Sequence, residues 1–214
     1  MKKPRDLLVL LVTACWLAST AWAQFSFYQI DDFEGAKTER WYRFGNAQMA
    51  IGVNPSFEAD DVIGESCGFY SLKLKGGTNN WYIGGIGSDL GLDATAYTRL
   101  QVDLYGSEAG GKLKIELFDD DNNNNILEQD SAADWQATKD DKYGIEVKVL
   151  EKGFTRLSIP FSAFKLENPG KGDGVWNPHQ KNGSAGLLKM QIILLADRSN
   201  GQAEVNLDNI LFTY

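Results

Sequence analysis

A two-residue alternation of apolar and polar side chains recurs along most of this chain. Residues 112–117 read Lys-Leu-Lys-Ile-Glu-Leu, and residues 144–149 read Gly-Ile-Glu-Val-Lys-Val. Successive side chains of a β-strand point to opposite faces, so each segment offers one apolar and one wetted face. No window after residue 23 shows the three-to-four-residue recurrence of a long helix. The pattern predicts an all-β protein built from antiparallel sheets.

About ten strands are expected, separated by segments such as Gly76-Gly77 and Gly84-Gly85, which are typical of turns. Residues 192–195 are apolar at every position, which indicates a strand covered on both faces. So many short strands in so little chain favour an antiparallel β-sandwich of the jelly-roll type. The expected strands lie near residues 27–33, 47–53, 69–75, 80–86, 98–105, 112–118, 144–150, 153–160, 189–196 and 203–213.

The first 23 residues are interpreted as an export signal. A short cationic start is followed by an apolar run, Leu7 to Leu17, that is too short to span a bilayer comfortably. Ala21-Trp22-Ala23 is a small-x-small cleavage pattern, so the mature protein is expected to begin at Gln24. Two alternatives stay open, an uncleaved anchor and a lipoprotein modified at Cys15, because residues 12–15 resemble a lipobox.

Residues 24–214 are expected to form a single domain of 214 − 23 = 191 residues. This part holds 21 − 3 = 18 basic and 29 − 1 = 28 acidic residues, a formal charge of −10. Such a surface repels phosphate backbones and anionic lipid, so nucleic-acid partners and membrane insertion after processing are not expected. Cys67 is then the one remaining cysteine and is expected to be a small buried residue. With no internal disulfide, stability must come from the core or from a metal ion.

An acidic, asparagine-rich string at residues 119–126 has the spacing of a calcium loop. Oxygen ligands at positions 1, 3, 5, 7 and 12 would follow the pattern of an EF-hand, although Asn124 replaces the usual glycine at position 6. The alternative is a solvated polar loop. The candidate calcium ligands are Asp119, Asp121, Asn123, Asn125 and Asp130.

Catalysis is not expected. The single histidine, His179, has no serine or cysteine nucleophile in a recognisable setting, and one histidine with one cysteine cannot build a tetrahedral zinc site. Glycine-rich phosphate loops of the known spacings are also missing from the sequence.

Three short sequence motifs resemble those of a known family. Residues 31–34 read Asp-Asp-Phe-Glu, residues 159–164 read Ile-Pro-Phe-Ser-Ala-Phe, and residues 207–210 read Leu-Asp-Asn-Ile. This order is similar to that of family-eleven carbohydrate-binding modules and related galactose-binding-like jelly rolls. The resemblance implies a concave sheet that takes a β-glucan chain, together with structural calcium. Carried over by motif, the calcium ligands would be Asp32, Glu34 and Asp208.

Sugar recognition needs flat aromatic rings and planar polar groups. Trp135 and Trp176 lie in polar, loop-like sequence surroundings. For Trp81 and Tyr82 the alternative interpretation is that they pack in the core. The candidate ligand-binding residues are Trp81, Tyr82, Trp135, Tyr143, Trp176, Asp140, Asp141, Lys165 and Asp173.

The sequence therefore predicts a non-catalytic protein that is exported to the periplasm, cell surface or medium. Its expected partner is a β-glucan-type polysaccharide or an envelope glycan, and its expected cofactor is structural Ca²⁺. The alternative is a structural component of an envelope or filament sheath built on the same β-sandwich, in which self-association would replace sugar binding.

Overall fold

The computed structural model describes residues 27–55, 67–133, 135–149 and 153–214. The expected export signal, Cys15 and the expected mature terminus Gln24 lie outside these residues. Within the described part, no helix has the length and apolar character needed to cross a membrane.

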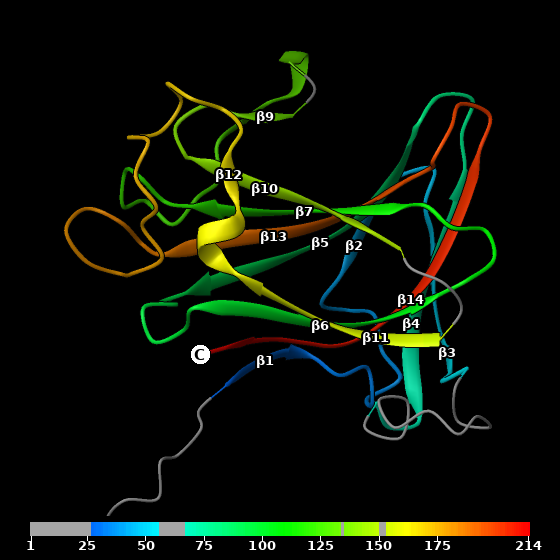
Figure 1. Ribbon diagram of the computed structural model, residues 1–214. Coiled ribbons are helices and arrows are strands. Elements are labelled where there is room, and N and C mark those ends of the chain that lie inside the picture. Colours follow the sequence, from blue (N-terminus) through cyan, green and yellow to red (C-terminus); the bar gives the residue numbers. More distant parts are fainter. Residues whose placement is uncertain (1–26, 56–66, 134, 150–152) are drawn as a thin grey trace, which may run out of the picture.

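The described residues form two six-stranded antiparallel sheets and a small hairpin (Figure 1). The predicted all-β antiparallel sandwich is confirmed. The first sheet has the order β11 (Gly153–Pro160), β6 (Arg99–Gly106), β14 (Gln202–Thr213), β4 (Tyr70–Gly77) and β3 (Gln48–Val53), with β1 (Tyr28–Asp31) also paired to β14. The second has the order β12 (Lys165–Leu166), β10 (Lys142–Lys148), β7 (Lys112–Asp119), β13 (Leu187–Leu195), β5 (Tyr82–Leu92) and β2 (Tyr42–Gly45).

A two-stranded hairpin of β8 (Gln129–Asp130) and β9 (Gln136–Ala137) stands apart from both sheets. Single 3₁₀ turns occupy Ser131–Ala133 and Phe161–Ala163. All ten expected strands are present. The short β2, β8, β9 and β12 were not expected, because segments of two to four residues are too short to show an alternation.

The alternating pattern divides each strand between the core and the surface. In β7, Leu113, Ile115 and Leu117 are fully buried between the sheets, whereas Lys114 and Glu116 between them face outward. Full burial of a Leu or Ile side chain is worth about 1.5–3 kcal/mol. Truncating Ile115 to alanine is therefore expected to cost about 2–5 kcal/mol of stability.

Two glycines expected to mark a turn lie instead inside a strand. Gly84 and Gly85 belong to β5, which pairs with β2 so that Phe44 lies opposite Gly85 and Tyr42 opposite Gly87. A Cβ atom on Gly85 would come within 2.9 Å of the Phe44 ring, and one on Gly87 would overlap the Tyr42 ring. The turn prediction was wrong at this position because both glycines lie tightly against the backbone of neighbouring strands. A Cβ atom on Gly84 would overlap the Phe44 carbonyl oxygen, and one on Gly85 would overlap the Ile192 carbonyl oxygen.

Cys67 is buried, as predicted, with 2% of its surface exposed. Its Sγ lies 3.4 Å from Oδ2 of Asp103. Burial, and then the neighbouring Asp103 charge, raises the pKa of the Cys67 thiol well above its ordinary value. A thiol held protonated in this way is a poor nucleophile.

Candidate functional site

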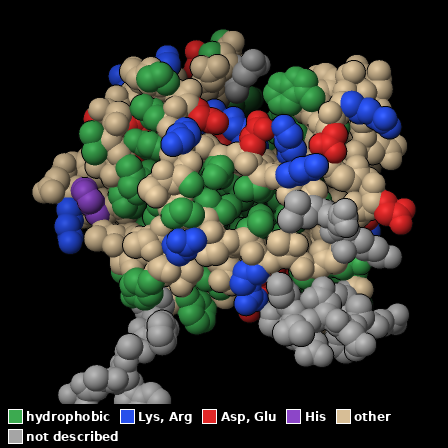
Figure 2. Space-filling model, viewed as in Figure 1, with side chains coloured by type: hydrophobic (Ala, Val, Ile, Leu, Met, Phe, Trp, Pro, Cys, Tyr) green, Lys and Arg blue, Asp and Glu red, His purple; other side chains and the backbone are tan. Residues whose placement is uncertain are grey.

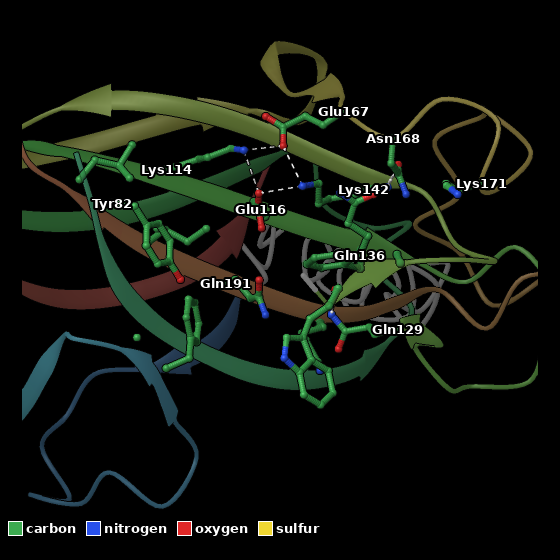
Figure 3. A pocket seen from close by; sticks show the side chains of 18 of the residues that line it. Tyr82, Lys114, Glu116, Gln129, Gln136, Lys142, Glu167, Asn168, Lys171 and Gln191 are labelled. Carbon is green, nitrogen blue, oxygen red and sulfur yellow. Dashed lines mark hydrogen bonds and ion pairs between the residues drawn. The ribbon is translucent and has the colours of Figure 1, made fainter. Parts of the chain in front are cut away.

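An open groove with a volume of about 1140 Å³ runs over the outer face of the second sheet. This volume lies slightly above the usual range of about 300–1,000 Å³ for small-molecule pockets, so the groove has room for a ligand of several units. In Figure 2, charged side chains of both signs are interspersed in the upper part of the molecule, above a central area of hydrophobic side chains. Figure 3 shows the groove from close by.

The floor of the groove comes from the outward positions of β13. Lys189, Gln191, Ile193 and Leu195 follow one another at every second residue and all line the groove. The inward positions between them, including Ile192, are buried in the core. The side chains of the fully apolar run at 192–195 therefore point to two different faces of the sheet. Its inward residues fill the sandwich, and Ile193 and Leu195 give the groove an apolar floor.

Four aromatic side chains on the groove are exposed to solvent. Trp135 is 65% exposed, Trp81 61%, Tyr42 39% and Tyr82 37%. The indole of Trp81 lies edge-on to Tyr82, with ring centroids 6.4 Å apart. The Tyr42 hydroxyl accepts a hydrogen bond from Nε2 of Gln191 at 3.1 Å. Large apolar rings exposed together, with polar groups beside them, mark a binding surface.

The β8–β9 hairpin carries Trp135 to the groove. Trp135 adopts the left-handed backbone conformation, with φ of 58°. Its N–H donates to the carbonyl of Asp130 at 2.9 Å, and its carbonyl accepts from Nε2 of Gln129 at 2.6 Å. These hydrogen bonds fix the backbone of Trp135. Its indole remains exposed and does not pack in the core.

A ring of alternating charges lies along one side of the groove (Figure 3). Lys114 Nζ lies 2.9 Å from Glu116 and 2.7 Å from Glu167, and Lys142 Nζ lies 3.2 Å and 3.3 Å from the same two carboxylates. We call these four residues the charged tetrad. Burial alone would lower the pKa of Lys114, but its hydrogen bonds to Glu167 and Glu116 raise the value above normal. The four ion pairs hold these side chains in place, so the tetrad offers fixed donors and acceptors.

The predicted ligand-binding residues divide into two groups. Trp81, Tyr82 and Trp135 line the groove, but Trp176 does not. Trp176 is partly buried against the core, with its ring centroid 5.0 Å from that of Tyr143 and 5.4 Å from that of Phe161. Tyr143 is itself 8% exposed and belongs to the core. Tyr143 therefore lies in the core and Trp176 packs against it, and both lie outside the groove lining.

The remaining candidates also lie off the groove lining. Lys165 is exposed on β12, and Asp173 is exposed in the loop that follows it. Asp140 and Asp141 are fully buried at the start of β10. Burial raises the pKa of Asp140 to about 7. None of these four side chains lines the groove.

The asparagine-rich loop after β7 does not have the expected EF-hand arrangement. It folds around Asp120, whose carboxylate accepts the backbone N–H groups of Asn122, Asn123 and Asn125. Asn123 and Asn125 are exposed and adopt left-handed backbone conformations. Asp130 is exposed on the hairpin and accepts the N–H of Ala132. The residues expected at positions 5, 7 and 12 thus have other roles.

Asp119 and Asp121 instead converge with Asp141. One carboxylate oxygen of each lies within 4.8 Å of the others. Burial raises the pKa of Asp119 to about 8 and that of Asp121 to about 6, and the neighbouring carboxylates add to both shifts. This group is called the β7–β10 carboxylate cluster below.

The carboxylates near the two ends of the domain also share one region. Glu34 accepts the N–H groups of Phe69 and Tyr70 through Oε1, each at 2.8 Å. Asp208, on β14, is fully buried, and its Oδ2 has no hydrogen-bond partner. Burial, and then the charges of Asp103, Glu34 and Asp32, raises the pKa of Asp208 to about 8. The orphaned buried oxygen of Asp208 is free to accept the calcium ion that the family resemblance implies. The carboxylates of this region do not, however, form a group within 4.8 Å of one another, as those of Asp119, Asp121 and Asp141 do.

Sequence reasoning missed most of the polar residues of the groove. Tyr42, Lys114, Glu116, Lys142 and Gln191 all line it. Three of the five, Lys114, Glu116 and Lys142, occupy outward positions on β7 and β10, which alternate clearly, so the strand pattern marks them as facing away from the core. The pattern does not show which outward face is hollow.

Comparison with known proteins shows that this chain is similar in fold to several solved structures. No family model matches the sequence, and no curated protein matches it. A solved structure of a family 11 carbohydrate-binding module from a cellulosomal cellulase of Clostridium thermocellum is similar, with a TM-score of 0.55, 14% identity, and coverage of 88% of this chain and 95% of that chain. A family 11 module of the same organism, in complex with a β-1,3-1,4-mixed-linked tetrasaccharide, is also similar. Its TM-score is 0.54 and its sequence identity 14%, and the match covers 87% of this chain and 95% of that chain.

An exo-β-agarase structure is also similar, with a TM-score of 0.51 and 12% identity, over 87% of this chain and 25% of that chain. At such identities the likeness concerns the fold. The predicted resemblance to family 11 carbohydrate-binding modules is confirmed at that level: the chain has the β-sandwich of these modules.

Proposed function

We propose that this chain is an exported, non-catalytic protein that binds a carbohydrate chain in the groove of its second sheet. The observation that carries the proposal is the gathering of four exposed aromatic rings, Tyr42, Trp81, Tyr82 and Trp135, on one groove with an apolar floor and charged groups along one side. Of the three candidate tryptophans, Trp81 and Trp135 share this surface and Trp176 does not. Scattered rings would have favoured the sheath-component alternative.

The groove has the chemistry that sugar recognition requires. A pyranose ring has apolar C–H faces that pack on an aromatic ring and hydroxyl groups around its edge that need donors and acceptors. The charged tetrad offers both, since the Lys114 and Lys142 ammonium groups donate and the Glu116 and Glu167 carboxylates accept. The Gln191 amide adds a planar group of the kind that pairs with neighbouring hydroxyls.

The structural neighbours support the same ligand class. Two of them are carbohydrate-binding modules, one of which was solved in complex with a mixed-linked β-glucan tetrasaccharide. A soluble mixed-linked β-1,3-1,4-glucan is therefore the first ligand to try, followed by xylan, agarose oligosaccharides and envelope glycans.

The acids of the groove are unsuited to glycoside hydrolysis. A glycosidase needs one carboxylic acid with a raised pKa that gives its proton to the leaving oxygen. Glu116 contacts two lysine ammonium groups. Burial alone would raise the pKa of Glu167, but its bonds to Lys114 and Lys142 lower it below normal. A Glu167 carboxyl with a lowered pKa and a Glu116 carboxylate bonded to two ammonium groups support binding without catalysis.

Affinity electrophoresis of the purified chain in gels with and without each soluble polysaccharide tests the proposal. We expect retardation in at least one gel, most strongly in mixed-linked β-glucan, and no release of reducing sugar on long incubation. Unchanged mobility across the whole panel would refute sugar binding. If that result came with concentration-dependent self-association in sedimentation velocity, it would support the sheath-component alternative.

A further inference from the structure

The β7–β10 carboxylate cluster lies outside the groove and has no part in the proposed sugar contacts. Asp119 ends β7, Asp121 follows two residues later, and Asp141 immediately precedes β10. Asp119 and Asp141 are fully buried, and Asp121 is partly buried. Three carboxylates within 4.8 Å of one another bring a formal charge of −3 into one small region.

Neutral groups supply the hydrogen bonds to this cluster. Each carboxylate oxygen of Asp121 and of Asp141 accepts one N–H donor, and so does Oδ2 of Asp119. Oδ1 of Asp119 is buried and has no hydrogen-bond partner. The donors are the backbone N–H groups of Asp141, Gly172, Gly174 and Asn177 and the side-chain amide of Asn177. An oxygen with a single donor still has a free lone pair, so every oxygen of the cluster can accept a further ligand.

The negative charge of the cluster has no basic partner. None of the ion pairs found among the described residues involves Asp119, Asp121 or Asp141. Buried like charges a few ångströms apart repel, and burial is costly for each of them. A bound proton would relieve part of the repulsion, whereas a divalent cation would neutralise two charges at once and give Asp119 Oδ1 its missing partner.

We propose that Asp119, Asp121 and Asp141 form a divalent-cation site whose preferred ion is Ca²⁺. Three carboxylates offer up to six oxygens, and Ca²⁺ takes six to eight in flexible geometry, whereas Mg²⁺ demands a near-ideal octahedron. Histidine and thiol ligands, which zinc and other transition metals favour, are not part of this cluster. The ligand set is not that of an EF-hand, since it joins two strand ends instead of one loop.

The cation site would also hold a third segment in place. The loop of residues 172–177 donates to all three carboxylates, and Gly172 packs so closely that a Cβ atom would overlap the Asp121 carboxylate. Asn177 contacts Asp119 through its backbone and Asp121 through its side chain. A bound cation would therefore link β7, β10 and this loop at one end of the second sheet.

Calcium titration calorimetry on chelator-treated full-length protein tests the site. The terminal carboxylates could bind a second ion, so the reference is the Asp208→Asn variant, in which that site is weakened. We expect this variant to retain one Ca²⁺-binding event. Adding Asp141→Asn or Asp121→Asn should weaken that event about tenfold or more, since even changes to groups that only orient the metal ligands cost about 10–100-fold in affinity. Adding Asp130→Asn, an isosteric change at the expected EF-hand position, should leave it unchanged.

Terbium luminescence gives a second readout that does not depend on stability. Tb³⁺ occupies carboxylate sites, and Tyr143 and Trp176 lie near the cluster, so excitation of these rings should sensitise emission. Excess Ca²⁺ should abolish the emission, and Asp121→Asn should reduce it in protein that remains folded by circular dichroism. Two results would overturn the proposal: no Ca²⁺ heat and no Tb³⁺ emission in the Asp208→Asn reference, or binding that survives Asp141→Asn and Asp121→Asn with unchanged affinity.

Discussion

The exposed indoles of Trp135 and Trp81 provide the sharpest test of the groove. A tryptophan presents at most about 250 Å² of surface, and Trp135 is 65% exposed. A sugar ring stacked on one face would cover about half of this exposed part, roughly 80 Å². At about 25 cal/mol per Å², the contact contributes about 2 kcal/mol, so Trp135→Ala should weaken binding about 10- to 30-fold. Trp81, at 61% exposed, should give a similar loss.

Isothermal titration with the best oligosaccharide from the panel measures these effects. Phe27→Ala is the matched control, because Phe27 is 58% exposed but does not line the groove. Trp135→Phe should recover part of the loss, since a smaller ring still stacks. If Trp135→Ala and Trp81→Ala both bind as tightly as the wild type, or if Phe27→Ala weakens binding equally, the reasoning is refuted.

Three further predictions concern stability and processing. Calcium at a hundredfold excess over its dissociation constant should stabilise the fold by about 2.7 kcal/mol per site. Asp208→Asn should remove the contribution of the terminal site, as seen by thermal unfolding in Ca²⁺ and in EGTA; identical melting curves in the wild type would contradict it. Arg156→Met should cost about 3 kcal/mol in chemical denaturation, because it leaves Asp103, which is fully buried and bonded to Arg156 at 2.7 Å, without its counter-charge. Intact mass of the exported protein should correspond to a start at Gln24, and a diacylglyceryl Cys15 would show lipoprotein processing instead.

The fold was predictable because its signal is local and repeated. Strands β6, β7, β10 and β11 alternate over seven or eight residues, long enough for the period to show. Strand β2 covers four residues, and its sequence Tyr-Arg-Phe-Gly places aromatic rings outward against glycines. Its place in the sheet depends on Gly85 and Gly87, some forty residues away. No local pattern shows that dependence.

The candidate site was predictable only in part, because residue type and spacing do not determine where a side chain points. Trp135 and Trp176 have similar polar sequence surroundings, yet one indole is exposed on a hairpin and the other packs on Tyr143. The asparagine-rich loop differs from the expected EF-hand arrangement for a related reason. Asp120 takes the backbone N–H groups of the asparagine loop, and this leaves Asp119 and Asp121 to meet Asp141, twenty residues further along the chain.

Consecutive residues at the start of β10 connect the two sites. Asp141 points into the β7–β10 carboxylate cluster, and Lys142 points into the groove as a member of the charged tetrad. The same division occurs after β12, where Glu167 completes the tetrad and the loop at 172–177 binds the cluster. A cation in the cluster would thus fix the backbone that carries Lys142 and Glu167, two of the four residues of the tetrad. The cation itself would not contact the bound sugar. Sugar affinity should then fall when Ca²⁺ is removed from wild-type protein but not from the Asp141→Asn variant, and an equal fall in both would show that the two sites are independent.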